Sequence, residues 1–238
     1  MTRECVVIPA LNAASTVGEV VAGVKKFAPD VPVLVVDDGS QDATSTQATR
    51  AGATVVRHPF RKGKGAGLAT GFAWALEQGH DAVCTLDADG QHAPSELPRL
   101  LDAHRQDEDA LIIGARAIRR VAGPMPPLNQ IGNRVSTFFI SLLAGQNVCD
   151  SQSGFRVYPR RLLEHPPRST GFEAETELIF TASRLGIPIR AVPVSTIYHP
   201  PEKHTSHFRR FDDTVRIIRW VLRDTLSHGL ARPKAPHP

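Results

Sequence analysis

Apolar residues follow two alternating patterns along the first half of the chain. Continuous aliphatic runs predict strands at 4–10, 31–40, 54–58, 81–90 and 109–116. Between them, apolar residues at helical spacing predict helices at 15–27, 42–51, 67–78 and 95–105, the first with Ser15 as its N-cap. Strands that are apolar on both faces and alternate with helices are typical of a parallel sheet covered on both sides. The sequence therefore predicts an α/β fold with a mostly parallel central sheet.

The second half follows a less regular pattern. It predicts a loop at 119–127, helices at 128–143, 173–185 and 212–226, a turn leading into a short strand at 149–159, and a strand at 187–199. Of the 238 residues, 41% are hydrophobic, which is enough for one sizeable core. We therefore expect a single domain over 1–228 and a flexible tail at 229–238.

Polar residues gather where the predicted strands end, at 9–12, 37–40, 87–91 and 114–116. Ligands of open α/β sheets bind beyond the carboxyl ends of the strands. The four clusters therefore predict one shared binding site at that edge of the sheet.

Composition restricts the function classes. Cys5, Cys84 and Cys149 are far apart, so neither a zinc site nor a disulfide framework is expected, and a reducing cytosol fits best. The N-terminus has no signal-peptide run, and the longest apolar segment, 135–145, is about half the ~20 residues of a membrane span. We expect a soluble or peripheral protein. The net charge of +4 suits an anionic ligand or membrane surface, and it fits simple solubility equally well.

Two carboxylates stand close together in "TLDADGQH", where Asp87 and Asp89 flank a single alanine. Like charges at this spacing repel each other unless a cation lies beside them. Oxygen ligands select Mg²⁺ or Mn²⁺, which proteins hold with one or two carboxylates together with substrate phosphates. The motif therefore indicates a metal–diphosphate site, although a solvated turn rich in Asp and Gly has the same composition.

Two further motifs carry candidate chemistry. In "VVDDGSQDAT", Asp37 and Asp38 could accept hydrogen bonds from a base or a ribose, and Ser40 or Asp42 could cap the next helix. In "RKGKGAGLATG", glycine amides at a helix start, with Lys62 or Lys64, could meet phosphate. The second motif lacks the P-loop and dinucleotide spacings, and a flexible basic turn is its alternative interpretation.

Taken in order, "VVIPALN", "VVDDGSQDAT", "KGKGAGLATG", "LDADGQH", "GAR" and "DSQSGFRVYP" resemble glycosyltransferase family 2, the inverting enzymes with the GT-A fold. More narrowly, the chain resembles the dolichyl- and polyprenyl-phosphate sugar synthases. The resemblance implies a nucleotide-sugar half over about 1–117 and an acceptor half over about 118–207. It also implies transfer of a mannose- or glucose-type hexose from a GDP- or UDP-linked sugar to a polyprenyl phosphate, with Mg²⁺ or Mn²⁺.

The resemblance also implies roles for individual residues. The nucleoside would be held by Pro9, Ala10, Asn12, Asp37 and Asp38, and the metal and diphosphate by Asp87, Asp89 and Gln91, with Lys64 nearby. The acceptor phosphate would meet Arg116, Arg134 and Ser136, while Arg156 would shape or support the sugar pocket. We place Lys203, His207 and Arg209 of "KHTSHFRR" as further phosphate contacts where the branch has a Ser-Lys element, and a solvent-exposed loop is the alternative. Leu11 and Ala13 depart from the aromatic residue and the acid usual in the family.

The nature of the acceptor decides whether a base is required. A phosphate is already an anion, so Asp89, Arg116, Arg134 and Arg156 would act by positioning and charge neutralisation. A hydroxyl acceptor, soluble or saccharide, would require a carboxylate base, for which Glu175 and its neighbours Glu173 and Glu177 are the candidates. An acid-rich helix start has the same appearance. A nucleic-acid-binding module is disfavoured because aromatic residues make up only 6% of the chain.

The segment 208–228 reads as a basic amphipathic helix. Phe211, Val215, Ile218 and Leu222 recur at helical spacing beside several arginines, which suits an anionic lipid surface on the cytoplasmic face of a membrane. The alternative is a core-packing helix, because Trp220 and Val221 widen the apolar arc. Many members of the resembled branch carry C-terminal membrane helices, so a small membrane partner subunit would be one way to anchor this chain.

Overall fold

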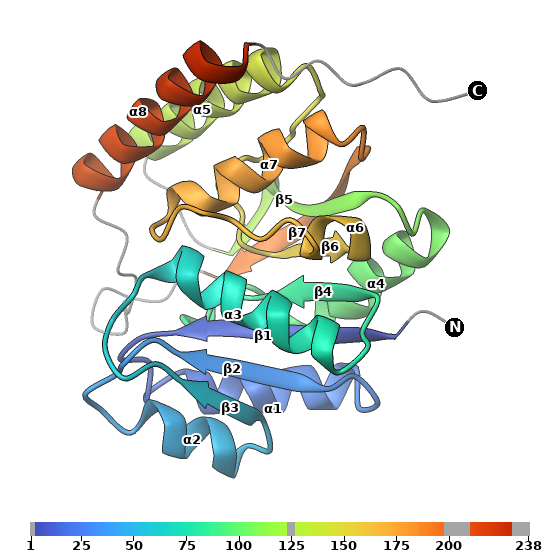
Figure 1. Ribbon diagram of the computed structural model, residues 1–238. Helices are drawn as coiled ribbons and strands as arrows, with labels where there is room; N and C mark the ends of the chain where they lie inside the picture. The colour runs from blue at the N-terminus through green and yellow to red at the C-terminus, as the bar shows by residue number, and fades with distance from the viewer. Residues whose placement is uncertain (1–2, 123–126, 198–209, 230–238) are drawn as a thin grey trace.

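A single seven-stranded sheet forms the centre of the protein (Figure 1). The structure, a computed structural model, describes residues 3–122, 127–197 and 210–229. The strands lie in the order β3-β2-β1-β4-β6-β5-β7. Their bounds are β1 Glu4–Ala10, β2 Val33–Asp37, β3 Thr54–Arg57, β4 Ala82–Thr85, β5 Leu111–Ala122, β6 Arg156–Pro159 and β7 Ile189–Ile197.

Parallel pairing dominates the sheet, as the sequence predicts. Strand β1 pairs in parallel with β2 and β4, β2 pairs in parallel with β3, and β5 pairs in parallel with β7. Among the strands of the described residues, β6 alone runs the other way, between β4 and β5. The helices are α1 Val17–Phe27, α2 Thr44–Arg50, α3 Lys64–Glu77, the 3-10 turn η1 Pro94–Glu96, α4 Leu97–Gln106, α5 Pro127–Ala144, α6 Arg160–Leu163, α7 Glu173–Arg184 and α8 Arg210–His228.

Two apolar cores lie on opposite faces of the sheet. Val6 and Ile8 of β1 point to one face, where they pack with α1, α2 and α4. Cys5 and Val7 point to the other, where they pack with α3, α5, α6, α7 and α8. Because successive strand residues alternate between two buried faces, the strand sequence is apolar throughout.

The structure departs from the predicted elements at several places. Thr16, rather than Ser15, precedes the first residue of α1. Helix α3 begins at Lys64 instead of 67, because its glycines allow close packing: a Cβ on Gly65 would lie 2.1 Å from the Ser169 carbonyl oxygen. The short helix α6 was not predicted.

Strand β5 is longer than predicted and does not end at residue 116. It continues to Ala122, through the first part of the predicted loop 119–127, because residues 121 and 122 pair with β7. The cluster 114–116 therefore lies within the strand rather than at its carboxyl end. No helix of the described residues is long and apolar enough to cross a membrane.

Candidate active site

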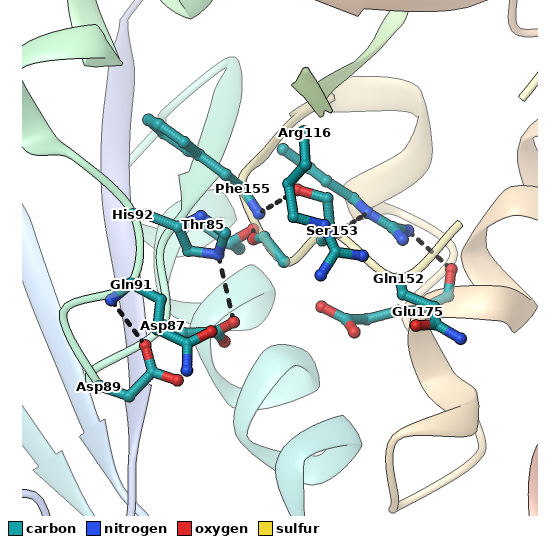
Figure 2. Close-up of polar contacts among 12 residues, drawn as sticks. Thr85, Asp87, Asp89, Gln91, His92, Arg116, Gln152, Ser153, Phe155 and Glu175 are labelled. Carbon is teal, nitrogen blue, oxygen red and sulfur yellow. Dashed lines mark hydrogen bonds and ion pairs between the residues drawn. The ribbon is translucent and has the colours of Figure 1, made fainter. Parts of the chain in front are cut away.

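A cavity of about 270 Å³ opens beyond the carboxyl ends of β1, β2 and β4. Predicted site residues that line it are Pro9, Ala10, Asp38, Lys64, Asp87, Asp89, Gln91, Arg116, Ser136 and Glu175. These residues come from both halves of the chain, so the fold joins the predicted nucleotide side and acceptor side in one site. Figure 2 shows Asp87 and Asp89 on one side of this region and Gln152 and Glu175 on the other.

Lys64 links two acids across the cavity. Its Nζ lies 2.7 Å from Asp87 Oδ1 and 3.1 Å from Glu175 Oε1. Burial alone would raise the pKa of Asp87, but the Lys64 ammonium and His92 hold that pKa well below its usual range. Burial likewise disfavours the charged form of Lys64, and the two acids raise its pKa nonetheless. Lys64 is thus a cation that compensates the negative charge of Asp87 and Glu175.

Asp89 lies in a different electrostatic environment. Burial, followed by the charge of Asp87, raises its pKa. Its Oδ1 accepts a hydrogen bond from the Gln91 amide at 3.0 Å, and His92 Nε2 lies 3.3 Å from Asp87 Oδ2 (Figure 2). A second cation beside Asp89 would reduce the electrostatic repulsion between the carboxylates of Asp87 and Asp89.

The donor set fits a hard divalent cation that keeps open positions. Among the described residues, no three His, Cys, Asp or Glu side chains gather as a complete metal cage. Asp87 and Asp89 nevertheless both line the cavity, and their carboxylate oxygens are ligands of the kind that Mg²⁺ and Mn²⁺ prefer. Mg²⁺ ordinarily uses one or two carboxylates and completes its shell with water and substrate phosphates.

The predicted nucleoside residues divide into two groups. Pro9, Ala10 and Asp38 line the cavity, whereas Asn12 and Asp37 do not. Asp37 is fully buried, and it accepts hydrogen bonds from the Ser40 amide at 2.8 Å and from the Ser45 hydroxyl. Asp37 therefore supports the turn beside the cavity in this structure, and its role in holding the nucleoside stays a prediction.

Asn12 is held in the same turn network as Asp37. Its backbone adopts a φ of 47°, its amide donates to Ser40 Oγ at 2.9 Å, and its side-chain oxygen accepts from the Gln41 amide at 2.8 Å. Asp42 accepts hydrogen bonds from the Thr44 amide at the start of α2 and from the Ala14 amide, although Ala43 rather than Asp42 or Ser40 stands at the N-cap position. Asn12 and Asp37 therefore lock the loops after β1 and β2 together.

Asp38 shapes the basic loop as well as facing the cavity. Its carboxylate accepts hydrogen bonds from the amides of Lys62 and Gly63 at 2.8 and 2.7 Å, and lies 2.7 Å from His58 Nδ1. The amide of Gly65 donates to the Thr170 carbonyl. These glycine-loop amides have protein partners, which corrects the prediction that they are presented to phosphate.

Of the two lysines predicted for the basic loop, Lys64 lines the cavity, and Arg61 lies there with it. Lys62 lies over the Phe60 ring at 5.8 Å, while the exposed side chain of Arg61 lines the cavity. Phe172 also lines it and carries the Lys64 ammonium over its ring at 5.4 Å. The sequence indicates the basic motif that contains Arg61, but it does not indicate which of the motif's side chains face the cavity.

Arg116 reaches the cavity as an ion-paired group. Its Nε lies 2.7 Å from Asp150 Oδ2 and its Nη2 2.9 Å from Asp150 Oδ1, a two-point pairing. Burial alone would raise the pKa of Asp150, and Arg116 lowers it below its usual range. Asp150 therefore fixes the guanidinium at the acceptor side of the cavity.

Arg156 is buried away from the cavity. It is 0% exposed, and its guanidinium donates to the backbone carbonyls of Ser151, Ser153 and Glu175 at 2.7–2.8 Å. Its place among the catalytic residues stays a prediction, because these bonds give it a supporting position in this structure. It holds the 151–153 turn against the first turn of α7, which is the supporting role also considered from the sequence.

The three acids of α7 have distinct surroundings. Glu175 is 7% exposed and faces the cavity, whereas Glu177 accepts hydrogen bonds from the amides of Arg168 and Ser169 at 2.9 Å each. Glu173 accepts from the Gly171 amide at 3.3 Å. Glu175 is thus the acid of this group that can meet a bound substrate.

Some predicted contacts lie outside what the structure describes. These are Lys203, His207, Arg209 and the side chain of Arg134, which belongs to α5. Their roles stay predictions. Cavity residues that sequence reasoning missed, or named only in passing, are Leu11, Ala13, Arg61, Gly63, Gly67, Ala88, Ile140, Ser151, Gln152, Phe172, Thr176 and Ile217. Most are small or apolar, so only their place in the fold marks them.

Comparison with known proteins places this site in a family. The family model described as "Glycosyl transferase family 2" matches residues 5–165. This chain belongs to glycosyl transferase family 2. The match includes all three acid and glycine motifs, and it confirms the family recognised from the sequence.

Relatives of this family 2 transferase include enzymes that act on lipid phosphates. An undecaprenyl-phosphate mannosyltransferase of Micrococcus luteus is 31% identical, with 92% of this chain and 94% of that protein covered. A polyprenol monophosphomannose synthase of Mycolicibacterium smegmatis is 33% identical, with 81% and 77% covered. Both similarities extend well past the nucleotide-sugar half.

A solved structure similar to this family 2 transferase contains both a divalent metal ion and a nucleotide sugar. Glucosyl-3-phosphoglycerate synthase of Mycobacterium tuberculosis, in complex with Mn²⁺ and UDP-glucose, superimposes with a TM-score of 0.70 at 26% identity. The alignment covers 98% of this chain and 81% of the synthase. The predicted α/β fold of the GT-A type, with its mostly parallel sheet, is confirmed.

Proposed function

We propose that this protein is an inverting, divalent-metal-dependent hexosyltransferase that moves a mannose- or glucose-type sugar from a GDP- or UDP-linked donor to a polyprenyl phosphate. The observation that carries the proposal is the cavity that brings Asp87 and Asp89 together with Arg116 and Ser136. Relatives at 31% and 33% identity with polyprenyl-phosphate mannosyltransferase names support the acceptor class. A dolichyl-phosphate hexose transferase of Haloferax volcanii, at 29% identity, does so as well.

The donor side would hold the nucleotide sugar by its diphosphate. Asp87, Asp89 and Gln91 would hold Mg²⁺ or Mn²⁺, which supplies positive charge to the departing diphosphate. Lys64 and Arg61 add two cations at the start of α3. The apolar residues Leu11 and Ala13 border the cavity after β1, where a nucleoside would lie in this arrangement.

The acceptor side would hold a phosphate without a general base. An acceptor phosphate is ionised at neutral pH, so the protein needs to orient it and exclude water rather than deprotonate it. Arg116 is fixed in the cavity wall by Asp150, and Ser136 adds a hydroxyl from α5. Glu175, bound to Lys64, would hold that lysine in position between the two sides.

Transfer of a radiolabelled hexose tests the proposal. The purified protein is incubated with UDP- or GDP-linked mannose or glucose, a polyprenyl phosphate and Mn²⁺. We expect label in the lipid fraction with at least one donor, none after chelation, and recovery when Mn²⁺ or Mg²⁺ is restored. Transfer that persists in chelator would contradict the metal requirement, and no lipid product with any donor would contradict the acceptor class.

The acceptor assignment of Arg134 has a separate test. Arg134→Ala should raise the KM for polyprenyl phosphate by about tenfold or more and leave the donor KM within about twofold. Arg168→Ala, which removes an exposed arginine outside the cavity, is the matched control. Equal weakening of donor and acceptor in Arg134→Ala would show that this arginine does not distinguish the two substrates.

A second candidate function is transfer to a soluble hydroxyl. The observation that favours it is Glu175, a buried carboxylate facing the cavity, in a fold similar to that of a glucosyl-3-phosphoglycerate synthase. Glu175→Gln distinguishes the two. A base on the reaction path would make the rate fall by about a hundredfold or more with a soluble acceptor. With a phosphate acceptor we expect a smaller loss, because Glu175 then only positions Lys64. The lipid-phosphate names of the relatives favour the first function.

A further inference from the structure

Two helices beside the cavity expose large apolar side chains. Phe138, Phe139 and Leu142 of α5 are 63%, 54% and 61% exposed, and Ile218, Leu222 and Leu226 of α8 are 52%, 58% and 87% exposed. We call these six residues the outer apolar face. Figure 1 draws α5 and α8 beyond α7 at one edge of the molecule. Exposed apolar side chains of this size, on two helices that border one cavity, are typical of a surface that meets another apolar phase.

Helix α5 is apolar on two opposite sides. Thr137, Ile140 and Ala144 are buried and face the protein. At ~100° per residue, Phe138 and Leu142 lie on the opposite side, together with Phe139, in an arc of about 100°. A helix that only packs on its own domain would carry polar residues there. The outward side of α5 therefore departs from the pattern of a helix that packs only on its own domain.

Helix α8 shows the same division and adds charge. Val221 is buried, and Trp220 packs edge-on against Phe180 of α7 with ring centroids 5.5 Å apart. Ile218, Leu222 and Leu226 lie four residues apart on an outer stripe. Arg219 and Arg223, both exposed, lie next to that stripe on the helix surface. The core-packing interpretation of this helix is therefore confirmed for the side that carries Trp220 and Val221, and its interpretation as a lipid-facing helix stays a prediction.

The inner sides of these helices reach the cavity. Ser136 and Ile140 of α5 line it, and so does Ile217 of α8. The outer apolar face thus lies on the same two helices that form the acceptor side of the site. A molecule bound against the outer face would be separated from the cavity by no more than the thickness of one helix, about 10 Å.

We propose that the outer apolar face docks on an anionic lipid bilayer, with Phe138, Phe139 and Leu142 inserted among the acyl chains and Arg219 and Arg223 on the headgroups. The proposal rests on the proposed function, because a polyprenyl phosphate presents its headgroup at such a surface. Arginine beside an exposed apolar stripe is complementary to an anionic interface, where aromatic and aliphatic side chains bury readily. This face would bring the cavity to the acceptor.

Vesicle flotation tests the apolar part of the face. The full-length protein is mixed with vesicles of phosphatidylcholine alone, or of phosphatidylcholine with phosphatidylglycerol. We expect binding to the anionic vesicles. The double substitution Phe138→Gln with Leu142→Gln should weaken that binding by about tenfold or more. The matched control is Phe27→Gln, which removes an exposed ring at the end of α1.

A double substitution of two arginines tests the positively charged residues beside the outer apolar face. Arg219→Gln with Arg223→Gln should weaken binding to anionic vesicles by roughly fivefold per arginine and make it less sensitive to salt. Lys25→Gln with Arg50→Gln removes the same net charge from exposed positions on α1 and α2. If both double variants lose affinity equally, the effect is one of net charge and the docking face is wrong.

Activity on two acceptors separates docking from function. The Phe138→Gln, Leu142→Gln variant should keep wild-type turnover on a short-chain, water-soluble polyprenyl phosphate and lose most of it on a long-chain one in vesicles. Vesicle binding without transfer to either acceptor would overturn the proposed function and leave the docking face standing. Transfer to the soluble acceptor without vesicle binding would overturn the docking face. A wild-type dimer in sedimentation that the same variant dissociates, with no vesicle binding, would assign the face to a second copy instead.

Discussion

The two sides of the cavity use charged residues in different ways. On the donor side, Asp87 and Asp89 follow directly from a strand end, and both face the cavity. On the acceptor side, the arginines marked by sequence motifs are already engaged: Arg116 by Asp150, and Arg156 by three backbone carbonyls. The Asp-x-Asp motif after β4 therefore supplies two side chains to the cavity, whereas the arginine motifs supply one guanidinium held in the cavity wall and one bonded to backbone carbonyls.

The difference has a physical cause. A carboxylate side chain is short, so just after a parallel strand it reaches either the ligand crevice, as Asp87 and Asp89 do, or the adjoining turn, as Asp37 does. An arginine side chain is long and carries five donors, so it can reach either a substrate or the protein's own carbonyls. Four substitutions test this contrast, in order of decreasing expected effect.

The donor-side acids should be needed for turnover but not for folding. Asp89→Asn keeps the shape of the side chain but removes the charge that would hold a divalent cation, so we expect turnover to fall by about a thousandfold or more. Asp109→Asn, at an exposed acid outside the cavity, is the control. Steady-state rates with Mn²⁺ and a thermal unfolding curve measure the two properties. Unchanged activity in Asp89→Asn would remove the metal–diphosphate interpretation of this motif.

The buried arginine of the acceptor side should show the reverse behaviour. Arg156→Met leaves three backbone carbonyls without their donor, so we expect a loss of about 3–5 kcal/mol in the free energy of unfolding. Urea unfolding measures it. Activity per folded molecule at low temperature should change much less than stability does. A variant of normal stability without activity would instead return Arg156 to the catalytic residues.

The Arg116–Asp150 pair should stabilise the protein in a pH-dependent manner. Its Asp150 pKa is lowered in the folded state, so the pair's contribution is present above about pH 4, the unfolded pKa, and is lost as pH falls through the folded pKa. Asp150→Asn should cost about 2–3 kcal/mol at neutral pH, because it leaves a largely buried guanidinium without its carboxylate.

Urea unfolding of the wild type and Asp150→Asn, repeated at decreasing pH, measures that difference. It should stay constant down to about pH 5 and shrink below about pH 4. A gap that widens in acid would contradict the assigned sign of the pKa shift.

The close packing of Gly65 in α3 against the 169–171 loop should make the stability of the protein sensitive to one added methyl group. A Cβ on Gly65 would lie 2.1 Å from the Ser169 carbonyl oxygen and 2.7 Å from Ala174 Cβ. Gly65→Ala should therefore cost about 2 kcal/mol of stability. The control is Gly18→Ala in α1, where the nearest atom is 3.8 Å away and a gain of about 0.5–1 kcal/mol is expected. Similar unfolding free energies for the two variants would show that α3 can move away from the 169–171 loop.

The outer apolar face illustrates the limits of sequence pattern. The sequence predicts a helix at 128–143, and the apolar segment 135–145 that overlaps it is too short to span a membrane. Its periodicity does not distinguish the buried side of that helix from the exposed side. Only the burial of Ile140 beside the exposure of Phe138 separates them. The membrane partner subunit, the roles of Lys203, His207 and Arg209, and the cytoplasmic location stay predictions.

The sequence by itself determined the α/β class, the order of most elements, the family and the acidic motifs at the ends of β2 and β4. These features depend on local periodicity and on residues a few positions apart, which a single chain displays directly. The tertiary structure decided which of those residues meet. Lys64 bridges Asp87 and Glu175 across 23 and 111 positions of sequence, and Arg61 faces the cavity while Lys62 does not. These contacts depend on packing between distant segments. Several groups can pair with the same charge, and only the folded structure decides which of them lies close enough to do so.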